Sequence, residues 1–240
     1  MTRECYTLKP MNQLNTTAIV LSRTDFGEAD RILTLLTPDY GKLRLMARGV
    51  RKVKSKLAGG IELFSISNVT FINGRGEIGT LISARLETYY SHIVENIERT
   101  MLGYELIKLL SRVTEDEPEA AYFELLQQTF QALNDDTTSI ELIRLWFAAH
   151  LLEQAGHSPN LQTDDTGAKL APGTAYNFNT ESMAFVPAER GRFTTNHIKF
   201  LRLLFGPHSP KALNQIQDLA SVLPDLTPLV QAMLKTHIRV

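Results

Sequence analysis

The sequence contains a single cysteine, Cys5, among its 240 residues. One cysteine can form neither an intramolecular disulfide nor a cysteine-based zinc site. The chain does not start with a charged segment followed by an apolar core, and it holds no run of 18 apolar residues. We therefore expect a cytoplasmic protein that does not enter a membrane.

Motifs of common enzyme classes are also missing. Gly-x-Ser-x-Gly, a Walker loop and His-Glu-x-x-His do not occur. Asp135-Asp136 and Asp164-Asp165 have no partner base, which favours loop or capping roles. His150 and His157 lie seven residues apart without a third ligand at a suitable spacing. We expect a protein that is not an enzyme and holds no metal.

The net charge of −1 hides an uneven distribution. Residues 1–80 hold 12 Lys and Arg against 7 Asp and Glu, whereas residues 81–240 hold 13 against 19. A basic front part joined to an acidic back part predicts two units with different partners. The neutral total therefore does not exclude nucleic acid.

Most of this basic excess lies in residues 42–56, the basic stretch. Leu43, Leu45 and Ala47 alternate there with Lys42, Arg44, Met46 and Arg48, which predicts a half-buried strand followed by a loop after Gly49. No carboxylate occurs between Asp39 and Glu62. The candidate phosphate-binding cations are Lys42, Arg44, Arg48, Arg51, Lys52, Lys54 and Lys56. The alternative is a charged hairpin that binds nothing.

The front of the chain has the pattern of a small barrel. After a loose leader over residues 1–15, we expect strands at 17–21, 31–36, 42–48, 63–72 and 78–86. The turn at 73–76 carries Arg75, a further candidate contact, and Arg23 and Arg31 are weaker ones. Five short strands with regular turns are typical of the oligonucleotide-binding (OB) barrel, here residues 16–88.

From residue 89 to 240 the period is helical. We expect helices at 102–113, 122–133, 139–154, 195–205, 209–223 and 227–237, with the nearly all-apolar 139–154 at the centre of a bundle. Residues 156–193 form an irregular insert that could hold a small hairpin of 176–178 with 183–186. The fold class is therefore α+β, an OB-type barrel followed by a helical domain.

Several segments, in this order and spacing, resemble the RecO family of recombination mediators. They are Arg31 to Pro38 (RILTLLTP), Gly41 to Lys52 (GKLRLMARGVRK), Ser55 to Gly59 (SKLAG), and Gly74 to Ile78 (GRGEI). A weaker match follows at Leu151 to Leu161 (LLEQAGHSPNL). The resemblance implies an OB domain followed by a helical domain, which the periodicities predict independently.

The resemblance also implies a function and partners. These are binding of single- and double-stranded DNA, annealing of complementary strands, and loading of recombinase on gapped DNA in the nucleoid. The implied partners are RecR and the acidic tail of single-stranded DNA-binding protein (SSB), with RecF and the recombinase as indirect ones. A tail pocket would lie in the helical domain, where Arg144 is the best candidate contact; its alternative is an ion pair with Glu141.

One departure concerns zinc. Many members of the family carry two Cys-x-x-Cys pairs in the insert, but here Thr163 to Gly167 stands at the first pair and Pro187 to Arg190 near the second. Thr and Pro cannot replace thiolates, so the insert is predicted to be metal-free.

Two further alternatives stay open. Phe26, Tyr40, Phe64 and Phe71 could stack on bases, but we favour positions in the strand core. The main rival function is a scaffold whose OB domain binds a protein and not DNA. A nucleic-acid hydrolase is more distant, because it needs clustered carboxylates or metal ligands that the sequence does not offer.

Overall fold

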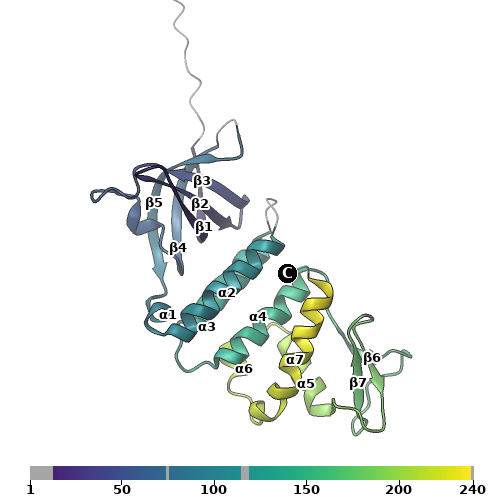
Figure 1. The fold of residues 1–240 in the computed structure, drawn as a ribbon. Helices are drawn as coiled ribbons and strands as arrows, with labels where there is room; N and C mark the ends of the chain where they lie inside the picture. Colours follow the sequence, from purple (N-terminus) through teal and green to yellow (C-terminus); the bar gives the residue numbers. More distant parts are fainter. Residues whose placement is uncertain (1–12, 74–75, 115–118, 239–240) are drawn as a thin grey trace, which may run out of the picture. The chain divides into compact units, whose positions relative to one another are not determined.

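The structure of the chain is a computed structural model, which describes residues 13–73, 76–114 and 119–238 (Figure 1). These residues form two compact units that divide between Tyr89 and Tyr90. The first unit is built of strands and the second mainly of helices. None of the helices in the described part of the chain has the length and apolar content that a bilayer span requires.

The first unit is the expected five-stranded barrel. Its strands are β1 (Gln13–Phe26), β2 (Asp30–Thr37), β3 (Gly41–Ala47), β4 (Ser65–Ile72) and β5 (Gly79–Tyr89). They close in the order β1-β2-β3-β5-β4. All neighbours are antiparallel except β3 and β5, which pair in parallel at two positions only, Leu45 with Gly79 and Met46 with Thr80.

The barrel core follows the period of two along the strands. Leu33 and Leu35 of β2 and Leu45 and Ala47 of β3 point inward and are buried, together with Phe71 of β4. The alternation expected in the basic stretch is thus confirmed. It leaves Arg44, the one charged residue between Leu43 and Ala47, on the outer face.

The first strand is longer than expected, and the leader is correspondingly shorter. β1 begins at Gln13, which pairs with Ile72, and runs to Phe26, which pairs with Asp30. Asn15 accepts a hydrogen bond from the Thr70 hydroxyl at 2.6 Å. Residues 13–15, of which Gln13 and Asn15 are polar, belong to the strand because pairing with β4 satisfies their backbone groups. Residues 1–12 of the expected leader lie outside the described residues.

The second unit contains seven helices among the described residues. They are α1 (Ser91–Glu95), α2 (Ile97–Val113), α3 (Ala120–Leu133), α4 (Ile140–Gln154), α5 (Thr195–Leu204), α6 (Pro210–Leu213) and α7 (Leu219–His237). The Asn96 side chain caps α2 and the Ser139 side chain caps α4. The central position of α4 is confirmed, because it packs against α2, α3 and α7 and buries nine of its side chains.

The last helix differs from the expectation. α7 is continuous from Leu219 although Pro224 and Pro228 lie inside it, whereas Pro228 was expected to open a new helix. Each proline removes one backbone donor of the helix. Burial of Val222, Leu226 and Val230 on one face offsets this loss.

The insert is an ordered sheet and not an irregular segment. β6 (Asn160–Asp164), β7 (Tyr176–Asn179) and β8 (Ala184–Pro187) pair in the order β6-β8-β7. The expected hairpin is confirmed as β7 and β8, but β6 was missed. Phe185 is fully buried and meets the rings of Tyr176, Phe178 and Phe193 edge to face. An aromatic cluster therefore orders the insert.

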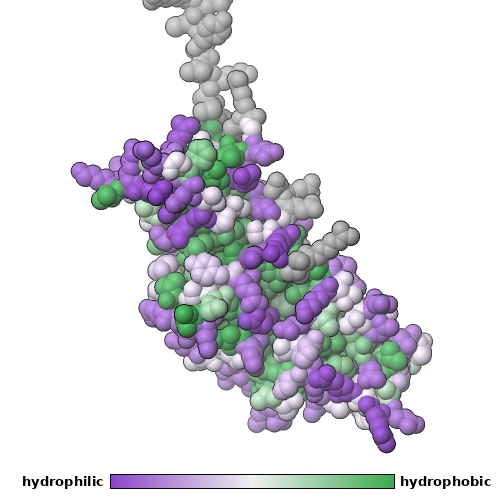
Figure 2. All heavy atoms as spheres, viewed as in Figure 1, coloured by the Kyte–Doolittle hydropathy of each residue, from purple (hydrophilic) through white to green (hydrophobic). Residues whose placement is uncertain are grey.

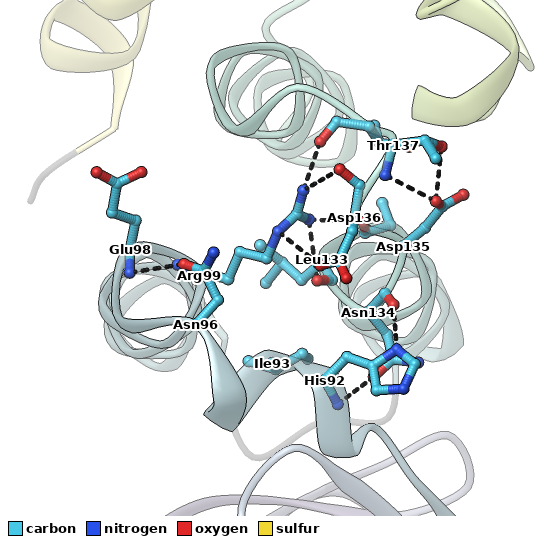
Figure 3. Close-up of polar contacts among 12 residues, drawn as sticks. His92, Ile93, Asn96, Glu98, Arg99, Leu133, Asn134, Asp135, Asp136 and Thr137 are labelled. Atoms are coloured by element: carbon cyan, nitrogen blue, oxygen red, sulfur yellow. Dashed lines mark hydrogen bonds and ion pairs between the residues drawn. The ribbon is translucent and has the colours of Figure 1, made fainter.

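A buried arginine joins α2 to the loop between α3 and α4 (Figure 3). The side chain of Arg99 is 5% exposed and lies 3.5 Å from the Asp136 carboxylate. Its guanidinium donates to four backbone carbonyls, those of Ala132, Leu133, Asp136 and Thr138. These carbonyls include orphan acceptors at the end of α3, so the cation satisfies them and also meets the negative end of the helix dipole.

Candidate functional site

Residues 48–56, the basic loop, leave the end of β3 and are fixed at their root to the turn between β1 and β2. The Gly49 N–H donates to the Asp30 carboxylate at 2.6 Å. The Arg51 N–H donates to the Ala29 carbonyl at 2.9 Å. Gly49 has φ +64°, a conformation that favours glycine, so the residue type suits the sharp turn out of the strand.

Beyond its root the loop is held by local turns. The Lys52 N–H donates to the Gly49 carbonyl at 3.1 Å, and the Ser55 N–H donates to the Lys52 carbonyl at 2.9 Å. Val53 is fully exposed. The tip of the loop therefore projects into solvent while its root is part of the barrel.

Four cations of the basic loop are presented to solvent. Their side chains are exposed, and within the described ranges no carboxylate forms an ion pair with any of them: Arg48, Lys52, Lys54 and Lys56. Figure 2 shows hydrophilic side chains gathered over the barrel at the upper left of the view. Cations without acidic partners are available to an anionic ligand.

The remaining cations of the basic stretch have other surroundings. Arg51 lies 3.6 Å from the Asp25 carboxylate and 3.4 Å from the Gly27 carbonyl oxygen, so its side chain helps to fix the loop root. Arg44 is exposed on β3 and lies 3.8 Å from Glu77. Lys42 is half-buried. Arg75, the candidate in the turn at 73–76, lies outside the described residues.

The weaker candidates on β1 and β2 are engaged with carboxylates. Arg31 donates to Asp25 at 2.7 Å, and Arg23 contacts Glu62 at 3.1 Å. The hydrogen bond from Arg31, followed by the charge of Arg51, holds the pKa of Asp25 below its usual range. Arg23 and Arg31 thus pair with carboxylates of the barrel, and Asp25 is held by both Arg31 and Arg51.

The aromatic residues of the barrel fall into two groups. Phe64 and Phe71 are buried, and Tyr40 packs edge to face on Phe71 with ring centroids 5.4 Å apart, so the core positions expected for these three are confirmed. Phe26 is 52% exposed, and its expected core position is wrong. It is the last residue of β1, where the strand extends beyond the packed interior of the barrel.

The helical unit contains a groove of about 420 Å³ between α2, α4 and α7. Its floor is apolar and is formed by Leu106, Leu109, Leu145, Phe147, Ala148, Val230 and Leu234. Four cations surround it: Lys108, Arg112, Arg144 and Lys235. Glu105 is the one acidic residue in the described lining. The groove thus combines an apolar floor with a cationic rim.

Arg144 lies in this groove, but its ion-pair partner differs from the expected alternative. The guanidinium contacts the carboxylate of Glu105 on α2, not Glu141 on its own helix. The other rim cations were missed in the sequence. Lys108 and Arg112 are four residues apart on α2, which is a visible signal, but only the packing brings them beside α4 and α7.

At the first of the two positions where the family carries cysteine pairs, the side chains bond to one another and to the backbone. The Thr166 hydroxyl donates to the Asp164 carboxylate at 2.7 Å, and the same oxygen accepts the N–H groups of Thr166 and Ala168. These bonds lower the pKa of Asp164, the Thr166 hydroxyl first. Over the described ranges, no three His, Cys, Asp or Glu side chains form a group that could hold a metal ion.

The two histidines considered as ligands have separate ring contacts. His150 packs on the Trp146 ring with centroids 4.3 Å apart, and burial lowers its pKa to about 4. His157 stacks on His237 with centroids 4.8 Å apart. Each imidazole therefore has its own packing role in the helical unit.

Comparison with known proteins covers both units. The family model described as recombination protein O, N-terminal, matches residues 11–90, and the model for its C-terminal part matches residues 94–240. A DNA repair protein RecO of Dehalococcoides mccartyi is 36% identical over 173 residues, which is 71% of this chain and 67% of that protein.

A DNA repair protein RecO of a Roseiflexus species is 37% identical over 161 residues, 66% of this chain and 56% of that protein. The matched stretch therefore spans between about half and two thirds of the length of these relatives. Since the two family models together match nearly the whole chain, it belongs to the RecO family of DNA repair proteins.

Proposed function

We propose that this protein is a non-enzymatic mediator of recombinational DNA repair that binds single- and double-stranded DNA without sequence specificity through the basic loop. The observation that carries the proposal is the exposure of Arg48, Lys52, Lys54 and Lys56 on an anchored loop with no carboxylate partner among the described residues. Cations of this kind bind backbone phosphates and release counterions.

Strand annealing follows from the same charges. Two complementary strands repel each other through their phosphates, and a shared cationic surface screens that repulsion. Backbone contacts carry no sequence information, so any pair of complementary strands would be served. The proposed role therefore needs neither a metal nor a catalytic group.

The groove of the helical unit supports the proposed protein partner. The C-terminal tail of SSB is acidic with an apolar end, and the groove offers an apolar floor inside a rim of Lys108, Arg112, Arg144 and Lys235. We propose that the tail binds there and brings the protein to SSB-coated DNA. RecR is proposed as the second partner, on the family resemblance alone.

The test is equilibrium binding of a labelled single strand at several salt concentrations. The variant Arg48→Ala/Lys52→Ala/Lys54→Ala removes three presented cations and leaves Arg51 at the loop root. Since each phosphate contact with a single strand adds about 0.7 to the slope of log affinity against log salt, the slope should become shallower by about 2.

The matched control removes three exposed cations of the helical unit, Lys169→Ala/Arg190→Ala/Lys199→Ala, and changes the net charge equally. It should keep the wild-type slope. If wild type and the loop variant bind equally and weakly, the barrel does not hold DNA, and the rival scaffold function becomes the better interpretation.

A further inference from the structure

The outer face of β1, β2 and β3 carries an apolar row next to the basic loop. Thr24 of β1 pairs with Ile32 of β2, and Ile32 pairs with Met46 of β3, so the three side chains share one face. Phe26, two residues after Thr24, lies on the same face diagonal to Ile32. The neighbours Leu33, Leu45 and Ala47 point the other way, into the core.

This row is accessible and not part of the barrel core. Phe26 is 52% exposed, and Ile32 and Met46 are half-buried. A half-exposed phenylalanine at a strand end contributes little to the stability of the barrel, because its ring remains largely in water. The ring is thus open to contact by a ligand with a flat apolar surface.

The root of the basic loop contacts the turn that follows Phe26, because the Arg51 guanidinium lies 3.4 Å from the Gly27 carbonyl oxygen. Phe26 pairs with Asp30, and the Asp30 carboxylate accepts the Gly49 N–H at 2.6 Å. The Arg51 N–H donates to Ala29 in the same turn. On the other side of the row, Arg44 is exposed on the outer face of β3. The apolar row therefore lies between the root of the basic loop and Arg44.

We propose that Phe26 is a base-stacking residue that makes this face selective for unpaired bases. Ile32 and Met46 would contact the same bound nucleic-acid strand. The inference rests on the proposed function of the basic loop. It adds that unpaired bases bind to the outer face of β1, β2 and β3, next to that loop. The charges fit a phosphate backbone, and the exposed ring fits the faces of unstacked bases, which a duplex does not offer.

The experiment compares two labelled single strands, an oligothymidine and a strand of the same length made of abasic sites. Phe26→Ala should weaken binding of the oligothymidine about five- to tenfold, the lower part of the range for base stacking. Binding of the abasic strand should not change. The salt slope should stay that of the wild type, because no cation is lost.

Two further variants of Phe26 and one control distinguish the loss of the aromatic ring from an effect on folding. Phe26→Leu keeps an apolar side chain at the strand end and should lose oligothymidine affinity as Phe26→Ala does, whereas Phe26→Trp should retain it. Tyr89→Ala removes an aromatic residue of similar exposure, 44%, at the end of β5 and should have no effect.

Wild-type affinity of Phe26→Ala and Phe26→Leu for the oligothymidine would overturn the inference, as would an equal loss on both strands. These results are distinct from failure of the proposed function. If the proposed function fails, Arg48→Ala/Lys52→Ala/Lys54→Ala would bind both strands as the wild type does. The inference about Phe26 would then be overturned together with the proposed function.

Discussion

Arg99 illustrates how one side chain can determine the ends of two helices. Its four carbonyl acceptors lie at the end of α3 and in the loop that leads into α4 (Figure 3). α4 in turn supplies Arg144 and the floor residues Leu145 and Phe147 to the groove. A buried cation of α2 therefore supports the proposed peptide site without lining it.

Arg99→Met should destabilise the helical unit by about 3–5 kcal/mol, because several buried carbonyls lose a charged donor at once. The free energy of unfolding is measured by chemical denaturation. Arg112→Met removes an exposed arginine of the same helix and should cost less than about 0.5 kcal/mol. A loss below about 1 kcal/mol for Arg99→Met would show that water replaces the guanidinium.

Phe26 shows where residue-level reasoning from the sequence fails. Phe64 and Phe71 fall in the expected strand at 63–72, where an apolar residue is expected to face the core. Phe26 falls after the expected strand at 17–21, and the same core position was expected for it. Phe26 differs because β1 extends past the interior of the barrel, and the length of that extension depends on pairing with Asp30. Nothing in the local pattern fixes how far a strand runs.

The elements themselves were largely predictable where one physical signal dominates. The barrel strands follow alternation, and α4 follows from its capping Ser139 and its apolar composition. α7 was divided in the prediction because Pro228 usually opens a helix, whereas burial of one whole face kept it continuous. β6 was missed because it is mostly polar and pairs in parallel with β8, a partner some 20 residues later.

At the scale of the insert, the aromatic cluster should take the place of a metal in maintaining order. Phe185→Ala should destabilise the insert by about 3–5 kcal/mol, the usual cost of truncating a buried phenylalanine. A strong chelator should leave the wild-type thermal unfolding transition unchanged. A transition that chelation lowers and added zinc restores would contradict the metal-free prediction.

On the scale of the whole molecule, the two proposed sites lie in different units, each with its own core. The cations of the barrel belong to one continuous stretch and could be found in the sequence. The groove could not, because its lining comes from three helices spread over residues 105–235 and only their packing assembles it.

The division predicts that the two activities can be separated. Lys108→Glu/Arg112→Glu should weaken binding of a labelled acidic peptide with an apolar end at least about tenfold, since two rim charges become repulsive. The same variant should keep the wild-type salt slope for single-stranded DNA. Lys169→Glu/Lys199→Glu, outside the groove, is the control for net charge. Parallel loss of both activities would contradict separate sites.

The closure of the barrel has a consequence for its dynamics. β1 and β4 are joined by seven paired positions, but β3 and β5 by two. A Cβ at Gly79 would lie 2.8 Å from the Ile72 carbonyl oxygen and from Leu45, so the seam closes only because that position is a glycine. The barrel is thus a curled sheet that is closed by a short parallel pairing of β3 with β5. Amide protons of the β3–β5 pairing would exchange with solvent before those of the β1–β4 pairing. Opening of the β3–β5 pairing would release β3, the strand that carries the basic loop.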